Sequence, residues 1–430
     1  MNADKQVIEL IKFARQHSRY FDHHFRALPD PVENLAILPL INPSDYWKES
    51  DHLEHWPVLT GALEHAVVFK TGGTTSSGKL SVFTQPEWQR LVKDFGSSCT
   101  SRFNQGDRVA NLFFAGDLYA SFVFIHDSLA HVGVGITEFP FTGAVEHGEL
   151  AGAILRHRIN VLAGVPAHLL KFADWLASRT MTLDVVDTVL YGGESLFAAQ
   201  RALLHRVMPN ARIASIGYAS VDAGFIGGSH RDCDDGEHRM NEQHTLVEII
   251  DEHTGEIIEG CDHTGLLIVT NLTRRLMPLI RYPVGDRACW REPVGTPGRK
   301  FALQGRSASA RRLRVVSATL FPEEMAEIIL RTVGADDWQL LIELRDQKTV
   351  LTLKWAHVAV PSSLNLTLRT ALLERYPELA ELITDGQLDL LIRGCTVDDL
   401  SLHPRSGKRQ RVVDLRFHDV PTMEASPWTR

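Results

Sequence analysis

The stretch from Lys70 to Lys79 is rich in glycine, threonine and serine. Glycine tolerates positive φ, so consecutive N–H groups of such a loop can converge on an anion, and Lys79 adds a positive charge. The pattern predicts a phosphate-binding loop, with an ordinary flexible hairpin tip as the alternative. The residues expected to face phosphate are Thr71, Gly72, Gly73, Thr74, Thr75 and Lys79.

The flanking sequence separates this loop from a P-loop. Gly73-x-x-x-x-Gly78-Lys79 is followed by Leu80 rather than by the Ser or Thr of a P-loop. Residues 66–69 and 80–83 have the composition of two strands, and the capping box Thr84–Glu87 predicts a helix only after the second. A P-loop joins a strand directly to a helix, so a P-loop kinase or NTPase is the less favoured function.

Two further candidate segments each follow an expected strand. They are Tyr191-Gly192-Gly193-Glu194-Ser195 and Gly217-Tyr218-Ala219-Ser220-Val221-Asp222. Ligands of parallel sheets bind outside the carboxyl ends of the strands, where both segments fall. A half-buried core tyrosine and a solvated turn aspartate are the simpler interpretations of Tyr218 and Asp222.

Together these segments resemble the adenylate-forming enzymes, which include acyl- and aryl-CoA ligases. The phosphate loop keeps Gly73, Thr74, Thr75 and Lys79 of the family pattern, although Ser76 and Gly78 replace its Gly and Pro. The resemblance implies that Gly193 and Glu194 flank adenine, and that Tyr218, with Ala219 and Ser220 beside it, stacks on it. It also implies that Asp222 binds Mg²⁺, which prefers hard oxygen ligands. Val221 replaces a threonine that contacts phosphate.

The segment Pro278–Asp286 resembles the phenylacetate-CoA ligase branch of the family most specifically. The resemblance implies that the Asp286 carboxylate accepts both ribose hydroxyls of ATP. Gly305-Arg306 resembles the hinge between the two family domains, but Ala308 and Ser309 stand where acidic residues are expected. Gly407-Lys408-x-x-Arg411 resembles the motif of the adenylation lysine, which implies that Lys408 is catalytic.

The elements needed to position these residues alternate along the chain. Helices are expected at 118–132, 150–158, 167–178 and 196–207, and the strands between them indicate a parallel, doubly wound α/β sheet. Antiparallel hairpins follow from Leu246, and residues 14–60 are expected to form a lid-like wrap. We predict a large domain at 1–305 that binds ATP and acid, and a small mobile α+β domain at 306–430 that carries Lys408.

Composition narrows the class of partner. The net charge of −8 argues against nucleic acid or an anionic membrane as the main partner. Five scattered cysteines suit a reducing cytoplasm, and no apolar run has the length of a membrane span.

His230, Cys233, His238 and His244 have spacings loosely typical of zinc sites, with a polar surface loop as the alternative. The sequence leaves a homodimer open.

The expected reaction is attack of a carboxylate on the α-phosphate of ATP, which yields an acyl-adenylate and pyrophosphate. The resemblance suggests an aromatic acid held by Phe113, Phe114, Tyr119 and residues 165–168; overall similarity suggests a phenazine acid of antibiotic biosynthesis.

Val316 and Ser317 replace an Arg-Gly turn that lines the coenzyme A tunnel of family ligases, so transfer to free CoA is expected to be slow. An amine, a carrier or another enzyme is then the acceptor. A catalytically lapsed nucleotide-binding relative is the main alternative.

Overall fold

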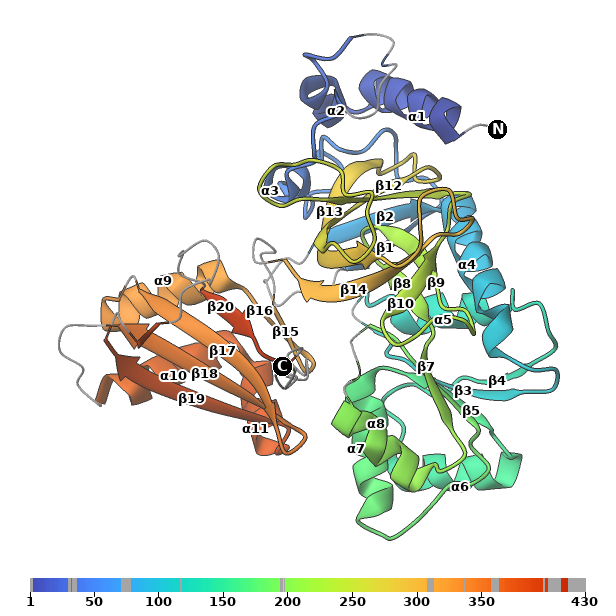
Figure 1. Ribbon diagram of the computed structural model, residues 1–430, viewed down its shortest axis with the longest axis vertical. Coiled ribbons are helices and arrows are strands. Elements are labelled where there is room, and N and C mark those ends of the chain that lie inside the picture. The colour runs from blue at the N-terminus through green and yellow to red at the C-terminus, as the bar shows by residue number, and fades with distance from the viewer. Residues whose placement is uncertain are drawn as a thin grey trace, which may run out of the picture. The chain divides into compact units, whose positions relative to one another are not determined.

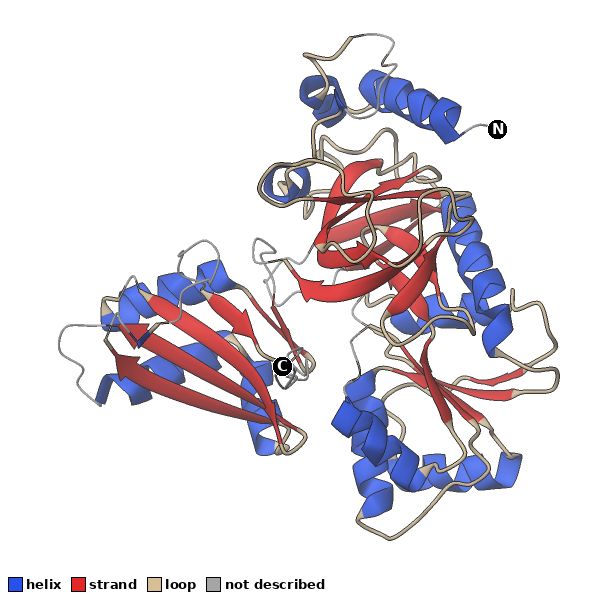
Figure 2. Ribbon diagram, viewed as in Figure 1, coloured by secondary structure: helices blue, strands red, loops and turns tan. Residues whose placement is uncertain are grey.

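The computed structural model separates into two compact units, Met1–Ser307 and Ala308–Arg430. It describes residues 3–29, 32, 37–70, 79–116, 118–193, 196, 198–307, 313–335, 337–356, 363–396, 399–400 and 411–416. The large unit combines a parallel sheet with antiparallel sheets, and the smaller unit is α+β (Figures 1 and 2). The predicted fold class is confirmed.

The parallel sheet of the large unit has the strand order β4-β3-β5-β6-β7. Its strands are β3 (Arg108–Leu112), β4 (Thr137–Phe139), β5 (Val161–Gly164), β6 (Thr188–Tyr191) and β7 (Arg212–Ser215). The connecting helices are α5 (Ser121–Leu129), α6 (His147–His157), α7 (Pro166–Ala177) and α8 (Ala198–Val207). One helix therefore separates each pair of successive strands.

Both faces of this sheet are buried. Successive strand residues alternate between two apolar clusters: Val161 and Ala163 pack with α4 and α5, whereas Leu162 packs with α6, α7 and α8. The same alternation holds for Val189 and Leu190 on the neighbouring strand. Side chains of a strand point alternately to opposite faces, so this pattern is that of a sheet wound on both sides.

The phosphate-loop segment is flanked by a hairpin. Strands β1 (Ala66–Lys70) and β2 (Leu80–Thr84) pair antiparallel, with Lys70 opposite Leu80. Helix α4 (Gln85–Cys99) and the short 3₁₀ helix η2 (Thr100–Arg102) follow. The predicted capping box is present, because the Thr84 hydroxyl accepts from the Glu87 amide and the Glu87 carboxylate accepts from the Thr84 amide. Lys79 thus enters a strand, unlike the lysine of a P-loop.

A seven-stranded antiparallel sheet follows the parallel one in sequence, with the order β11-β12-β13-β14-β10-β9-β8. Its strands are β8 (Gly217–Ser220), β9 (Gly224–Gly228), β10 (Glu237–Met240), β11 (Thr245–Ile250), β12 (Gly265–Asn271), β13 (Leu279–Trp290) and β14 (Lys300–Arg306). Strand β13 carries the segment that most resembles phenylacetate-CoA ligases. It therefore lies near the middle of this sheet, paired on both sides.

The N-terminal segment belongs to the core of the antiparallel sheet. Its helices are α1 (Ala3–His17), α2 (Arg19–His24) and α3 (Pro43–Trp47). Tyr46, Trp47 and Trp56 are each at most 6% exposed and share an apolar cluster with residues of β12 and β13. The segment is therefore an integral part of this core and not the lid-like wrap that the sequence predicted.

The small unit contains a four-stranded sheet of order β19-β18-β17-β20 and a separate hairpin. The strands are β15 (Leu313–Val315), β16 (Ala318–Leu320), β17 (Trp338–Arg345), β18 (Lys348–Ala356), β19 (Leu388–Cys395) and β20 (Val412–Asp414). The helices are α9 (Pro322–Val333), α10 (Ser363–Arg375) and α11 (Pro377–Thr384). Pro322 and Pro377 begin their helices, as proline favours the first turn.

Some element boundaries differ from those expected. The helix expected at 118–132 is limited to α5, because Leu118 has a φ of 61° and Gly133 and Gly135 follow its end. In the turn between β15 and β16, the residue with a positive φ, 57°, is Val316. It is not Ser317, which stands where the family pattern has glycine. The valine thus occupies the position that favours glycine.

Within the described ranges, every helix is too short or too polar to cross a membrane.

Candidate active site

Tyr218 and Asp286 lie in contact, although different motifs of the sequence singled them out. The Tyr218 hydroxyl donates a 2.5 Å hydrogen bond to Asp286 Oδ2 across 68 positions of sequence. Tyr218 lies on β8, and Asp286 is opposite Arg306 at the end of β14. Asp286 is half-buried, and a carboxylate has about four lone-pair positions, so it retains acceptor capacity for a diol.

The Tyr218 ring is supported from behind by His238 and Phe301. Their ring centroids lie 5.5 and 6.1 Å from that of Tyr218, respectively. His238 is buried, and its Nε2 lies 3.1 Å from the Ser215 hydroxyl. Burial lowers the pKa of His238 to about 4, so the ring is neutral at pH 7.

Gly193 lies at the carboxyl end of the parallel sheet, where β6 and β7 run side by side. The Ile216 amide donates to Tyr191 O at 2.8 Å, which brings the segment before Tyr218 beside the segment before Gly193. Gly193 is exposed and has a φ of 86°, a conformation that side chains disfavour. Ser220 on β8 accepts a 3.0 Å hydrogen bond from the Ala223 amide and so fixes the turn that follows Ala219.

Asp222 lies in that turn and is only 3% exposed. Its Oδ1 accepts from the Ala223 amide at 3.2 Å, and its Oδ2 accepts from the Tyr282 hydroxyl at 2.9 Å. Mg²⁺ retains several water ligands and needs room around its carboxylate. A hydrated Mg²⁺ ion therefore does not fit the Asp222 carboxylate in this arrangement, and the residue acts as an acceptor that joins the turn to β13.

Arg274 anchors the same turn from the protein interior. Its guanidinium is 1% exposed and donates to Asp222 O, to Ser81 Oγ at 3.1 Å and to Val82 O at 2.6 Å. Burial lowers the pKa of Arg274, while the nearby Glu87 and Asp222 carboxylates oppose that shift. Sequence reasoning missed this residue, because its partners lie about 50 and 190 positions away and no local pattern marks them.

Lys79 is the described residue that follows the phosphate loop, and its ammonium lies over an aromatic ring. The Lys79 Nζ atom is 5.4 Å from the ring centroid of Trp47. The Trp47 Nε1 donates to the Tyr282 hydroxyl at 3.0 Å, which in turn donates to Asp222. Lys79 and Asp222 are thus connected through two aromatic side chains, neither of which the sequence singled out.

Several predicted site residues lie outside the described residues. They are Thr71, Gly72, Gly73, Thr74, Thr75, Glu194 and Lys408, together with the hinge positions Ala308 and Ser309. Arg306 is the last residue of β14, one position before the boundary of the large unit. The structure therefore brings together Tyr218, Asp222, Asp286 and their neighbours, and the roles of all the predicted site residues stay predictions.

The residues expected to hold the acid cluster partly around the ends of β3 and β5. Phe114 is 38% exposed, and its ring packs edge-on against His168 with centroids 5.9 Å apart. His168 is buried, and burial lowers its pKa to about 4. Its Nε2 is buried and lacks a hydrogen-bond partner among the described residues. Phe113 belongs to the core beneath, with Ile125 and Ile216.

The four residues weighed as a zinc site are separate. His244 Nδ1 pairs with Asp94 Oδ2 at 2.5 Å, and His238 faces Ser215. Within the described residues, all four of these included, no three His, Cys, Asp or Glu side chains converge as metal ligands. The zinc interpretation is therefore not supported, because His238 on β10 and His244 just before β11 have different partners.

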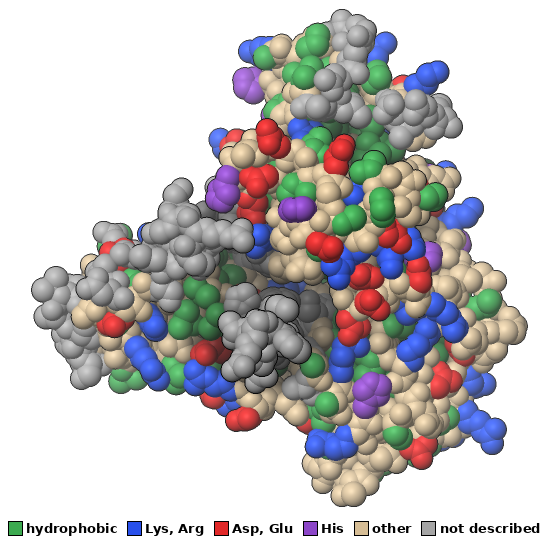
Figure 3. All heavy atoms as spheres, in the orientation of Figure 1, with side chains coloured by type: hydrophobic (Ala, Val, Ile, Leu, Met, Phe, Trp, Pro, Cys, Tyr) green, Lys and Arg blue, Asp and Glu red, His purple; other side chains and the backbone are tan. Residues whose placement is uncertain are grey.

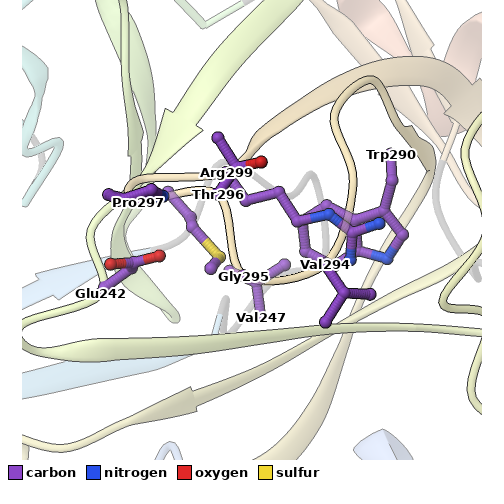
Figure 4. A pocket seen from close by; sticks show the side chains of 9 residues that line it. Glu242, Val247, Trp290, Val294, Gly295, Thr296, Pro297 and Arg299 are labelled. Atoms are coloured by element: carbon purple, nitrogen blue, oxygen red, sulfur yellow. The ribbon is translucent and has the colours of Figure 1, made fainter.

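A pocket of about 290 Å³ lies beside the β13–β14 turn (Figure 4). Its lining includes Met240, Val247, Trp290 and Val294, with Glu242 at the edge. The Arg299 guanidinium lies 4.1 Å from the Trp290 ring centroid and donates to two backbone carbonyls. The pocket contains none of the predicted nucleotide-site residues.

Acidic and basic side chains are mixed on the face shown in Figure 3. Arg239 pairs with Asp232 and Glu292, and Arg291 pairs with Glu237 and Asp262. Each of these two arginines therefore has two carboxylate partners, which offset its positive charge.

The chain is similar in sequence to enzymes that activate carboxylic acids. It is 27% identical over 370 residues to the phenylacetate-coenzyme A ligase of Aromatoleum evansii, covering 81% of this chain and 80% of that enzyme. It is also 27% identical over 187 residues to the indoleacetate–lysine synthetase of Pseudomonas savastanoi, covering 43% of this chain and 42% of that enzyme. No family model matches the chain.

The fold is similar to that of a solved 2-hydroxyisobutyryl-CoA ligase in complex with 2-HIB-AMP and CoA. The TM-score is 0.72 at 15% identity, with 96% of this chain and 90% of that chain covered. The chain therefore has the fold of the adenylate-forming ligases, and its sequence similarities support that superfamily.

Proposed function

We propose that this protein adenylates a carboxylic acid with ATP, producing an acyl-adenylate and pyrophosphate. The contact between Tyr218 and Asp286 is the observation that carries the proposal most directly. An aromatic side chain for adenine and an acceptor for the ribose diol are adjacent, and the segment that contains Tyr218 follows the carboxyl end of the parallel strand β7, where ligands of such sheets bind. Sequence similarity to a phenylacetate-coenzyme A ligase supports the same reaction.

In this reaction a carboxylate oxygen of the acid attacks the α-phosphorus of ATP. The bond from that phosphorus to the bridging oxygen breaks, and its electron pair leaves with pyrophosphate. Two anions must approach each other, so positioning and positive charge provide most of the catalysis. In our proposal Lys79 and Lys408 supply that charge, Arg306 is the hinge, and the contacts to the nucleotide come from Thr71, Gly72, Gly73, Thr74, Thr75, Gly193, Glu194, Tyr218, Ala219, Ser220 and Asp286.

Mg²⁺ enters this proposal as a companion of the ATP phosphates. Asp222, expected as its ligand, is buried and accepts hydrogen bonds from the protein. We therefore assign Asp222 to the positioning of the turn that follows Tyr218, and no step of the reaction depends on a metal bond to it.

The proposed substrate is an aromatic carboxylic acid, with a phenazine acid as the specific candidate. The names of the two sequence relatives, which refer to phenylacetate and indoleacetate, support an aromatic acid. The half-exposed Phe114 ring and the neutral His168 ring beside it offer an apolar wall. The cytoplasm is the proposed location, and the five free cysteines support it.

The relatives support two classes of acceptor for the acyl group. One is named a coenzyme A ligase and the other a synthetase that acts with lysine. Val316 and Ser317 occupy the turn between β15 and β16, where the family ligases have Arg-Gly. We therefore propose an amine, a carrier thiol or another enzyme as the principal acceptor, and free CoA as a slow one.

Isotope exchange between pyrophosphate and ATP tests the proposal. The exchange should depend on an added acid and should be strongest with aryl acids, phenazine carboxylates included. A P-loop kinase would not catalyse it, and a lapsed relative would bind ATP without exchange. Absence of exchange across the whole panel, with ATP binding shown by calorimetry, would reject adenylation.

A further inference from the structure

We propose that Trp47, from the N-terminal segment, is a positioning residue for Lys79 and thereby for the phosphates of ATP. The inference rests on the proposed function, since it concerns the same nucleotide site. It assigns a role in ATP binding to a segment that contains none of the family motifs. Its basis is the ring of Trp47 beneath the Lys79 ammonium, 5.4 Å from centroid to Nζ.

The orientation of the Trp47 indole is fixed from several sides. The side chain is 6% exposed and stacks on Trp56, with ring centroids 5.5 Å apart and planes at 24°. Its Nε1 donates to the Tyr282 hydroxyl at 3.0 Å, and that hydroxyl donates to Asp222 at 2.9 Å. Because both the face and the edge of the indole are held, its orientation toward Lys79 is fixed.

The partners of Trp47 lie on the elements that carry the nucleotide residues. Tyr282 is four positions before Asp286 on β13, and Asp222 is in the turn after β8, which carries Tyr218. Helix α3, which ends at Trp47, lies beside β13 in Figure 1, and Trp47 shares an apolar cluster with residues of β12. The ammonium that follows the phosphate loop is therefore located relative to the proposed ribose and adenine contacts.

A tryptophan suits this task better than a carboxylate would. The face of an indole attracts an ammonium through its quadrupole and does not neutralise the positive charge. A lysine side chain has four rotatable carbons and loses considerable freedom when it is fixed in one position. The contact with Trp47 reduces that loss before ATP arrives.

A double-mutant cycle tests the inference in the full-length protein. The variants are Trp47→Leu, Lys79→Ala and the double substitution, each measured for ATP Kd by calorimetry and for the ATP KM and kcat of pyrophosphate exchange. Trp47→Leu should raise Kd and KM roughly 2- to 6-fold, the value of one cation–π contact, with kcat nearly unchanged. In the Lys79→Ala background the same substitution should have no further effect.

Trp290→Leu is the matched control. Trp290 is 4% exposed, belongs to the same apolar cluster as Trp47 and donates to Ile258 O at 2.9 Å, but it lines the pocket that contains none of the predicted nucleotide-site residues. Trp290→Leu should lower the thermal midpoint of unfolding as much as Trp47→Leu and leave the ATP Kd unchanged. Trp47→Phe, which keeps an aromatic face, should restore most of the affinity.

Equal weakening of ATP binding by Trp47→Leu and Trp290→Leu, or additive effects in the cycle, would overturn the inference and leave adenylation untouched. If no acid supports exchange but ATP binds, adenylation fails, and the calorimetric cycle still decides the role of Trp47. If ATP does not bind at all, both proposals are rejected.

Discussion

The Tyr218 hydroxyl donates to the Asp286 carboxylate, so the proposed adenine contact and the proposed ribose contact are bonded to each other before any nucleotide binds. The hydroxyl occupies one acceptor position that a ribose hydroxyl would use. ATP must therefore compete with, or add to, a bond already made. This relationship allows the ring and the hydroxyl of Tyr218 to be tested separately.

Asp286→Ala should weaken ATP binding at least about 10-fold. It removes the acceptor of two charge-assisted hydrogen bonds, each worth about 1.5–3 kcal/mol. Calorimetric titration with ATP measures the effect. Tyr218→Phe is the matched control, because it keeps the ring and removes only the hydroxyl that donates to Asp286, and it should bind ATP as tightly as the native protein or more tightly. An unchanged Kd for a folded Asp286→Ala variant would remove Asp286 from the site.

Lys408→Ala should leave ATP binding nearly intact and slow adenylation roughly 10²- to 10³-fold. This is the loss expected when one donor that acts in the transition state is removed. Stopped-assay pyrophosphate exchange and ATP calorimetry together separate the two effects. Lys348→Ala, which removes a lysine paired with Asp389 at 2.6 Å in the same unit, is the control and should exchange at the native rate. Native exchange by Lys408→Ala would show that the terminal motif has another role.

Stability should fall between pH 6.5 and 4 because of His168 and His238. Burial lowers the pKa of each to about 4 in the folded state, whereas the unfolded pKa is 6.5. Between these values the unfolded chain binds protons that the folded protein does not. The unfolding free energy should therefore drop by about 2 kcal/mol per histidine from pH 7 to pH 5.

Urea unfolding at pH 7 and pH 5 measures this dependence. His168→Leu and His238→Leu should each flatten it, irrespective of their effect at pH 7. His52→Gln is the control, since the His52 side chain is 75% exposed and should make no difference. An undiminished pH dependence in both buried-site variants would contradict the assignment.

Val316→Gly should stabilise the small unit by about 1 kcal/mol. The β-branched side chain has a φ of 57°, and left-handed backbone costs non-glycine residues roughly 1–2 kcal/mol, partly offset by the greater entropy of an unfolded glycine. The midpoint of urea unfolding reports the change. Val315→Gly, in the buried strand position beside it, should destabilise instead. A lower midpoint for Val316→Gly would mean that the valine side chain contributes contacts that outweigh the strain.

Thioester formation with free CoA should be slow compared with adenylate formation. The Arg-Gly pair of the family turn is replaced by Val316 and Ser317, which removes a cation that could meet the phosphates of CoA. Mass spectrometry after incubation with ATP, an accepted acid and CoA should detect acyl-adenylate in excess of acyl-CoA. The Ser317→Gly, Val316→Arg double variant should shift the ratio towards acyl-CoA. Rapid conversion of the adenylate by the native protein would establish a plain CoA ligase.

Local sequence patterns correctly predicted those elements of the fold that depend on interactions between neighbouring residues. Thr84 and Glu87 form the predicted capping box. The residues of β5 and β6, which include Val161 and Leu190, alternate between the two faces of the sheet, as a doubly wound sheet requires. Asp286 was identified because the segment around it is distinctive. These features depend on neighbours within a few residues, which a sequence shows directly.

Trp47 and Arg274 escaped prediction for a different reason. Trp47 is the last residue of a short helix among prolines, and its partner Tyr282 lies 235 positions away. Arg274 precedes a distinctive segment but bonds to residues about 50 and 190 positions distant. Asp222 received a metal role from its position in a motif, whereas its burial depends on these same distant residues. Such contacts arise from the closing of the sheets upon each other, which no local pattern contains.

The buried guanidinium of Arg274 also has a consequence for the order in which the chain can mature during synthesis. Its acceptors include Val82 O, which leaves the ribosome 192 residues earlier. At about 5–20 residues per second, the β1–β2 hairpin waits roughly 10–40 s for the side chain that completes its interior. During that interval the apolar side chains of Phe83 and its neighbours lack their final cover. In the nascent chain the β1–β2 hairpin is thus a candidate binding site for a chaperone until Arg274 has been synthesised.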